Sequence, residues 1–354
     1  MSLLFSPITF KSITLKNRIV ISPMCQYSAT DGFANDWHLV HLGSRALGGA
    51  ALIIQEATAV TPEGRISYGD LGIWKDEHIA PLQRITKFIE DNGAVPGIQL
   101  AHAGRKASCE VPWLGGGEIK EGPHHWQTVA ASAIPFYETD NTPHALTIDE
   151  IKNTVQAFKA AAGRALQAGF KVVEIHAAHG YLINQFLSPL SNTRNDEYGG
   201  SFENRSRFLM EVIDAVQEVW PVELPVFVRI SASEWVEGGW TIEDSVQLAG
   251  ILKTKNIDLV DCSSGGNSAQ AKITAGPGYQ VQFAAAIKQQ ANIPTAAVGI
   301  ITNAKQAEAI LQAGEADLIL IARESLRNPH FALHAAKELG DDIDWPNQYV
   351  RAKR

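Results

Sequence analysis

The chain has 354 residues, 45% of them hydrophobic and 19% charged, a balance typical of a globular protein with a sizeable core. Its formal net charge of −8 argues against nucleic acid or an anionic membrane as a partner. No membrane-spanning run or signal peptide is evident, and the three scattered cysteines fit neither a disulfide framework nor a zinc site. We therefore expect a cytoplasmic protein.

Short apolar runs typical of buried strands alternate along the chain with amphipathic stretches typical of helices. The predicted strands are residues 18–22, 51–55, 95–100, 172–175, 226–230, 259–262, 295–298 and 318–321. The predicted helices are residues 37–47, 78–91, 148–168, 202–219, 242–255, 280–290, 303–313 and 326–339. Eight strand–helix units predict one α/β domain folded as a (β/α)8 TIM barrel, because doubly wound sheets usually have five or six strands.

Local signals place several helix ends. Thr147 and Glu150 form a predicted capping box, Thr241 and Asp244 a near match, and Thr302 is a predicted N-cap. Left-handed C-terminal caps are predicted after three helices, at Gly93, Gly169 and Gly314.

Two connections that follow predicted strands are too long for simple loops. The first, after the third strand at about residues 103–143, is rich in Gly, Pro and Trp, and we interpret it as a lid insertion. The second, residues 177–200, is interpreted as a wall of the same barrel mouth. We expect one domain over residues 1–340, followed by a mostly polar tail over residues 341–354.

Polar rings gather where the fourth predicted strand ends, in the stretch VVEIHAAHGY. His176 ends the strand, and His179 and Tyr181 lie within the next five residues. The carboxyl ends of barrel strands carry the chemistry in this fold, so these three side chains predict a site.

Two arginines also end predicted strands. Gly299 and Arg323, after the seventh and eighth strands, predict a phosphate site. Arg229 ends the fifth strand and should face either a carboxylate or, as we favour, an anionic ligand. His38 with His41, like His176 with His179, has a spacing compatible with metal ligands. No HExxH motif or convergent carboxylates support a metal, so none is expected.

At these residues the chain resembles the old yellow enzyme family, in particular the group of xenobiotic reductase A and the thermophilic-like ene-reductases. The matching blocks cover nearly the whole chain in the right order. They are SPMCQY from Ser22, GIQLAHAGRKAS from Gly97, EIHAAHGYLINQFLSPLSNTRNDEYGGSFENRSRF from Glu174, VRISASEW from Val228 and ARESLRNP from Ala322. The third block is far more specific than any short motif.

The resemblance implies non-covalent FMN, reduced by NADPH in preference to NADH, in a ping-pong reduction of the C=C bond of enones or maleimides. The cofactor-binding residues that it implies are Ser22, Pro23, Met24, Cys25, Ala57, Gln99, Arg229, Gly299, Ala322 and Arg323. His176 and His179 would hydrogen-bond the substrate carbonyl, and Tyr181 would protonate the α-carbon. The implied substrate-binding residues are Cys25, Tyr27, His176, His179 and Arg351.

Arg351 looks like the arginine that this group contributes from a neighbouring subunit, which implies a homodimer or homotetramer. The chain departs from its relatives in two places. Ala322 stands where glycine is common, and residues 274–279 lack the tryptophan of xenobiotic reductase A, so the substrate preference is not carried over.

Three alternatives stay open at this point. One is another FMN barrel, such as a dihydroorotate or dihydrouridine oxidoreductase, although the charge disfavours the RNA-binding version. Another is a flavin-binding redox sensor that uses Cys25, and the last is a metal-dependent barrel hydrolase.

Overall fold

A computed structural model describes residues 1–353, and eight parallel strands form its centre. These strands are β3 (Ile19–Ile21), β4 (Leu52–Ala59), β5 (Val95–Ala101), β8 (Val172–Ala177), β9 (Val226–Ser231), β10 (Leu259–Ser263), β11 (Thr295–Ala297) and β12 (Leu318–Ile321). They close in the order β10-β11-β12-β3-β4-β5-β8-β9, which confirms the predicted barrel.

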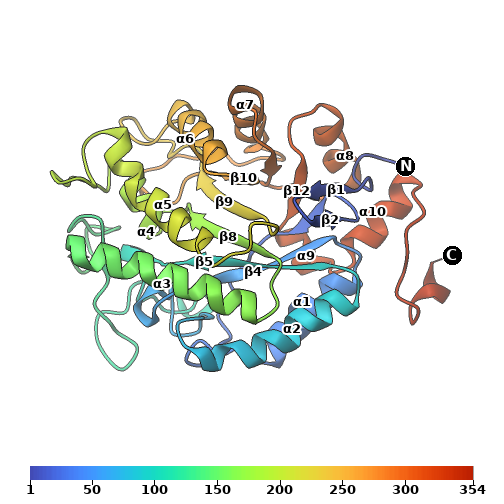
Figure 1. The fold of residues 1–354 in the computed structure, drawn as a ribbon, viewed down its shortest axis with the longest axis horizontal. Coiled ribbons are helices and arrows are strands. Elements are labelled where there is room, and N and C mark those ends of the chain that lie inside the picture. Colours follow the sequence, from blue (N-terminus) through green and yellow to red (C-terminus); the bar gives the residue numbers. More distant parts are fainter. Residues whose placement is uncertain (354) are drawn as a thin grey trace.

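Helices surround this barrel (Figure 1). They are α1 (Asp36–Leu47), α2 (Ile79–Asp91), α3 (Ile148–Gln167), α4 (Leu182–Leu187), α5 (Phe202–Gln217), α6 (Ile242–Thr254), α7 (Val281–Ala291), α8 (Ala304–Gln312), α9 (Arg323–Arg327) and α10 (Phe331–Leu339). The amphipathic stretches therefore fold as predicted, apart from the last of them.

The predicted 326–339 helix is wrong, because the chain forms two helices, α9 and α10, around Pro329. Proline lacks a backbone N–H and disfavours helical geometry in the residue before it. Asn328 accordingly leaves the helical region, with φ −133° and ψ 87°.

The helix caps follow the sequence signals with one exception. Capping boxes at Thr147 and Thr241 are confirmed. Thr302 is not the N-cap of α8, because Asn303 is extended there and its side chain accepts a hydrogen bond from the Gln306 N–H. Left-handed backbone is confirmed at all three predicted glycines, Gly93, Gly169 and Gly314.

A hairpin that the sequence patterns did not reveal packs against the interior of the barrel. It consists of β1 (Ile8–Phe10) and β2 (Ile13–Leu15), which pair antiparallel. Phe10 packs edge-on against the inward-facing Phe227, with ring centroids 5.4 Å apart. The apolar residues around this contact form a cluster separate from the core between strands and helices.

The segment predicted as a lid folds from short pieces. It contains the 3₁₀ turns η3 (Gly104–Lys106) and η4 (Pro112–Leu114) and the strand β6 (Val129–Ala130), which pairs with β7 (His144–Ala145). The other 3₁₀ turns are η1 (Pro62–Gly64), η2 (Asp76–His78) and η5 (Val350–Ala352). Among residues 1–353, no helix combines the length and hydrophobicity that crossing a membrane requires.

Candidate active site

Three adjacent strands set the layers of the site through their period of two. Val172, Phe227 and Leu259 belong to the apolar cluster inside the barrel. Two positions further along β8, β9 and β10 come Glu174, Arg229 and Asp261, and two further come His176, Ser231 and Ser263. The polar side chains thus lie toward the carboxyl ends, where a barrel places its site.

The two predicted histidines meet at this end of β8. His179 Nδ1 lies 3.3 Å from His176 Nε2, and His179 Nε2 lies 2.7 Å from Ser263 Oγ. His176 Nδ1 accepts a hydrogen bond from the Ala178 N–H, so the ring proton of His176 is on Nε2. The Ser231 hydroxyl accepts from the His179 N–H.

Both imidazoles are neutral hydrogen-bonding groups at ordinary pH. Burial, reinforced by the positive charge of Arg229, lowers the pKa of His176 and of His179 well below the usual value. A neutral ring donates from one nitrogen and accepts at the other, so His179 Nδ1 accepts from His176 Nε2 and the His179 proton lies on Nε2, facing Ser263 Oγ.

Tyr181 joins the pair, because its ring centroid lies 5.0 Å from that of His176 at a nearly perpendicular angle. Lys106 of η3 lies over the Tyr181 ring, with Nζ 5.3 Å from the centroid. The same ammonium donates to the carbonyl oxygens of His179 and Gly266, both at 2.8 Å. Lys106 therefore ties the lid segment to the loop after β8, which carries His179 and Tyr181, and to the loop after β10.

The loop after β3 forms another side of the site. Glu56 of β4 accepts from the Gln26 N–H at 2.7 Å and faces His38 Nε2 at 3.6 Å. Tyr27, two residues after Cys25, takes a left-handed conformation with φ 51°. Burial, then the charges of nearby carboxylates, raise the pKa of Cys25 well above its usual value, so the thiol stays protonated.

Arg229 faces a carboxylate, which is one of the two alternatives for this cation. Its Nε lies 3.0 Å from Asp261 Oδ2, and its Nη1 donates to Ser22 Oγ at 3.3 Å. Gln99 of β5 and Ala57 of β4 are buried beside this group in the register of β5 with β4 and β8.

The loops after β11 and β12 enclose a cavity of about 280 Å³, which includes Gly299, Ala322 and Arg323 in its lining. Gly299 has φ +124°, and a Cβ there would lie 3.1 Å from Gln280 Nε2 and 3.2 Å from the Tyr279 ring. A backbone without a side chain beside an exposed arginine suits a phosphate group.

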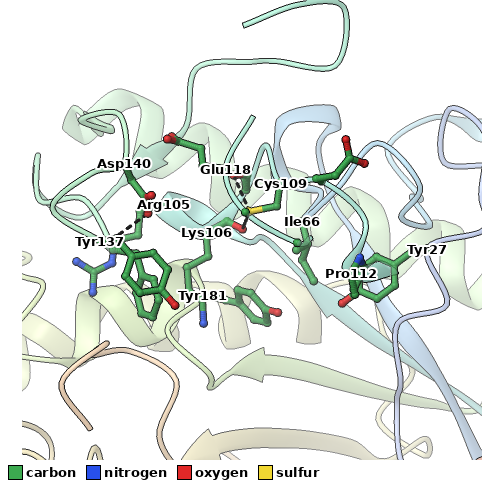
Figure 2. A pocket seen from close by; sticks show the side chains of 15 residues that line it. Tyr27, Ile66, Arg105, Lys106, Cys109, Pro112, Glu118, Tyr137, Asp140 and Tyr181 are labelled. Atoms are coloured by element: carbon green, nitrogen blue, oxygen red, sulfur yellow. Dashed lines mark hydrogen bonds between the residues drawn. The ribbon is translucent and has the colours of Figure 1, made fainter. Parts of the chain in front are cut away.

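A second cavity, of about 290 Å³, lies between Tyr181 and the lid segment. Figure 2 shows Lys106 and Tyr181 below Cys109 and Glu118, with Tyr27 and Pro112 on one side. This cavity gives a small molecule access to the phenol of Tyr181.

Arg351 lies elsewhere. It lines a cavity with His330, Trp345 and Tyr349 beside α10. In the described residues, no group of three or more His, Cys, Asp or Glu side chains is arranged to hold a metal ion, and His38 faces Glu56 instead.

Three contributing residues were missed as parts of the site. Lys106 lay within a matching block but had been given no role. Glu174 and Asp261 are fully buried next to Arg229, and each is a charge within an otherwise apolar strand. That interruption of an apolar run is the signal that could have pointed to them.

The architecture defines the class, a (β/α)8-barrel protein with polar side chains gathered at the carboxyl ends of its strands. The chain belongs to the NADH:flavin oxidoreductase / NADH oxidase family, whose sequence profile matches residues 3–342. It is an FMN-dependent NADH/NADPH oxidoreductase of the old yellow enzyme family.

Individual relatives agree with this assignment. An NADPH dehydrogenase of Geobacillus thermodenitrificans (strain NG80-2) is 54% identical over 355 residues, covering 100% of this chain and 99% of the relative. Morphinone reductase superposes with a TM-score of 0.79 at 30% identity, over 98% of this chain and 92% of its own. The old yellow enzyme homologue of Zymomonas mobilis gives 0.78 at 28% identity, over 97% and 94%.

A larger protein also contains this fold. This chain superposes on 2-naphthoyl-CoA reductase, in its complex with 2-naphthoyl-CoA, with a TM-score of 0.86 at 26% identity. The match covers 96% of this chain, but this chain spans only about half, 52%, of that protein.

Proposed function

We propose that this enzyme reduces the C=C bond of α,β-unsaturated carbonyl compounds, such as enones and maleimides, in a ping-pong cycle with NADPH as the preferred reductant. The observation that carries the proposal is the contact of two neutral imidazoles with each other and with Tyr181, in the layer above Arg229. The 54% identity to an NADPH dehydrogenase supports the choice of NADPH over NADH.

His176 and His179 bind the substrate carbonyl oxygen. Their facing nitrogens, Nε2 and Nδ1, are close enough for one oxygen to accept from both. When an oxygen binds between these nitrogens, the His179 proton moves from Nε2 to Nδ1, and the Ser263 hydroxyl then donates to His179 Nε2. As negative charge develops on the oxygen, each such donor contributes about 3 kcal/mol to the transition state.

Tyr181 is the general acid that protonates the α-carbon. Burial, followed by nearby acidic groups, raises the pKa of its phenol well above the usual value, so the proton is held until a carbanion-like carbon accepts it. Tyr27 and Cys25 bound the substrate on the opposite side of the mouth.

We assign the binding of FMN to the residues that the family resemblance implies. Ser22, Pro23, Met24, Ala57, Gln99 and Arg229 would contact the ring, and Gly299, Ala322 and Arg323 the phosphate. The buried guanidinium and the cavity beside Gly299 fit such an anionic group. When bound, FMN supplies a hydride to the β-carbon of the substrate.

The tail supports an oligomer in which Arg351 serves a neighbouring subunit. Trp345 and Gln348 line a cavity together with Lys16, Gly49 and Gly93, which precede strands β3, β4 and β5. The tail therefore packs at the amino-terminal face of its own barrel, opposite the His176 layer, and lies far from residues 103–143 (Figure 1). In this proposal Arg351 reaches the barrel mouth of another copy of the chain.

Isotope labelling tests the reaction directly. With 2-cyclohexenone and NADPH in D2O, we expect saturated ketone equal to the NADPH consumed, with solvent deuterium at the α-carbon. With NADPH deuterated at the transferred position, the label should appear at the β-carbon. Oxidation of NADPH that leaves the enone intact would contradict the proposal and favour another oxidant.

A further inference from the structure

A charged layer lies inside the barrel, directly beneath the histidines. Glu174 of β8 and Asp261 of β10 are fully buried, and Arg229 of β9 lies between their strands. The apolar cluster around Phe227 and Phe10 lies below this layer. The layer is therefore closed to water on the side away from the active site.

One cation faces two carboxyl groups in this layer. Arg229 Nε lies 3.0 Å from Asp261 Oδ2, and Gln99 Nε2 donates to Glu174 Oε1 at 2.7 Å. Strands β3, β5, β11 and β12 contain no charged residue, and Glu56 of β4 faces His38 instead. Burial raises the pKa of the adjacent Cys262 thiol, which therefore stays neutral.

A proton held by the two carboxyl groups supplies a donor that the layer otherwise lacks. Glu174 Oε2 and both Asp261 oxygens are buried without a donor in hydrogen-bonding geometry, although Arg229 Nε lies near Asp261 Oδ2. The two carboxyl groups are close enough for each to influence the pKa of the other. A proton on one of them makes that group a donor to the other, which two carboxylates could not provide.

The proton belongs on Glu174. Burial raises the pKa of both carboxyl groups and Arg229 lowers both, but the negative charge of Asp261 further raises the pKa of Glu174, whereas the interaction with Glu174 lowers that of Asp261. Protonated Glu174, ionised Asp261 and Arg229 together carry no net charge, which is the state that a low-dielectric interior favours.

We propose that Glu174 and Asp261 are a proton-sharing pair of positioning residues that orients Arg229, fixes the net charge beneath the flavin and so sets its reduction potential. Reduction adds negative charge to the flavin, and a neighbouring positive charge favours that addition. Asp261 offsets the charge of Arg229, whereas protonated Glu174 leaves the charge of the layer unchanged. This inference rests on the proposed placement of the flavin beside Arg229.

The pair predicts a difference between single and double isosteric variants. The midpoint potential of FMN in the purified holoenzyme is measured by spectral titration with a reference dye, without enone. The double variant Glu174→Gln/Asp261→Asn should raise the equilibrium constant for two-electron reduction at least tenfold, a shift of about 30 mV, because no carboxylate then balances Arg229. Glu174→Gln alone should change it less than threefold near neutral pH, because the amide resembles the protonated acid.

Two results in this titration overturn the inference. A Glu174→Gln shift close to that of the double variant would mean that both carboxyl groups are ionised in the wild type. An unchanged potential in the double variant would separate the pair from the flavin. Glu234→Gln is the matched control, because Glu234 is another fully buried carboxylate that accepts hydrogen bonds from Ser188, Trp240 and Asn267.

Infrared spectroscopy of the flavin-free wild-type protein provides a second readout, which holds even if the double variant fails to fold. The C=O band of a buried protonated carboxylic acid should be present near neutral pH, shift in D2O and lose intensity in Glu174→Gln but not in Glu234→Gln, while Glu56, whose pKa burial also raises, can contribute the remaining intensity. Absence of the band in wild type overturns the inference. Neither measurement uses an enone, so failure of the proposed reaction would leave both results interpretable.

Discussion

At the scale of single residues, His179 stands out because it holds an active-site ring in a backbone conformation that favours glycine, φ 60°. The conformation is fixed from two sides. The Ser231 hydroxyl accepts from the His179 N–H, and Lys106 donates to the His179 carbonyl oxygen. The position of the ring therefore depends on a side chain from the lid segment.

Lys106→Met should lower enone turnover by about 10- to 100-fold, because each charge-assisted hydrogen bond contributes about 1.5–3 kcal/mol. Lys106→Arg should recover part of the loss, since it keeps the charge.

Burial and the nearby Arg105 lower the pKa of Lys106 to about 8. As the pH rises through this value Lys106 loses its charge, so wild-type turnover should fall there while the Lys106→Arg profile stays flatter. Equal turnover in Lys106→Met and wild type would exclude this role.

Tyr181→Phe tests the proposed general acid. Removing the phenolic proton should slow reoxidation by 2-cyclohexenone by about 100-fold or more, the usual contribution of a positioned acid. Reduction by NADPH should keep its rate, because it needs no proton from Tyr181. Rapid-mixing absorbance measurements resolve the two half-reactions, and a loss confined to the NADPH step would refute the assignment.

His176, His179 and Tyr181 could be predicted from the sequence because they lie at the end of an apolar strand. Polar residues in that position reach the mouth of a barrel. The interactions of Arg229 were less accessible. Its partner Asp261 lies on the neighbouring strand, and the two residues come together through the pairing of β9 with β10, which no local sequence pattern reveals. The sequence therefore allowed a carboxylate partner for Arg229 but did not identify Asp261 as that partner.

At the scale of elements, the β1–β2 hairpin shows what periodicity misses. Each of its strands has three residues, too few to establish an alternating pattern. Its contribution lies in a tertiary contact, the packing of Phe10 against Phe227.

Phe10→Ala should reduce the free energy of unfolding by about 3–5 kcal/mol, the usual cost of truncating a buried phenylalanine. Urea denaturation followed by tryptophan fluorescence measures the change. Phe88→Ala on α2 is the control, because Phe88 is exposed and its loss should cost much less. Equal losses in the two variants would mean that the hairpin adds little to the barrel.

The capping box of α3 predicts a pH dependence of stability. The hydrogen bond from the Thr147 backbone, then that with His144, lowers the pKa of Glu150 from 4.5 to about 2. A lowered folded-state pKa means that the stabilisation is present above about pH 4.5 and is lost as the pH falls toward 2. The difference in unfolding free energy between wild type and Glu150→Ala should shrink over that interval, with Asp149→Ala as control. A difference that stays constant with pH would contradict this.

At the scale of the whole molecule, the barrel was predictable because eight apolar runs and their helices repeat in order, and the register of β3 to β12 follows from closure. Pro329 and Asn303 are themselves local signals, for a helix break and for a helix N-cap. The longer amphipathic pattern of the helices outweighed them in the prediction. The tail could not be placed by pattern, because Trp345 lines a cavity with residues that are remote in sequence, such as Gly49.

Arg351→Ala tests whether a second copy completes the site. Because a hydrogen bond to a charged group contributes about 1.5–3 kcal/mol, KM for the enone should rise about tenfold or more. Lys353→Ala removes a tail charge that pairs with Asp342 and should leave KM unchanged. Mixing Arg351→Ala with a Tyr181→Phe variant should partly restore turnover if subunits exchange. Unchanged turnover and KM in Arg351→Ala would confine the tail to a structural role.

The visible spectrum of the purified enzyme, followed anaerobically through addition of NADPH and then 2-cyclohexenone, tests the central claim most directly. The account predicts a yellow protein that NADPH bleaches and the enone restores to yellow, which reports the bound flavin and both half-reactions. A protein that bleaches but stays colourless after the enone would contradict the proposed reaction.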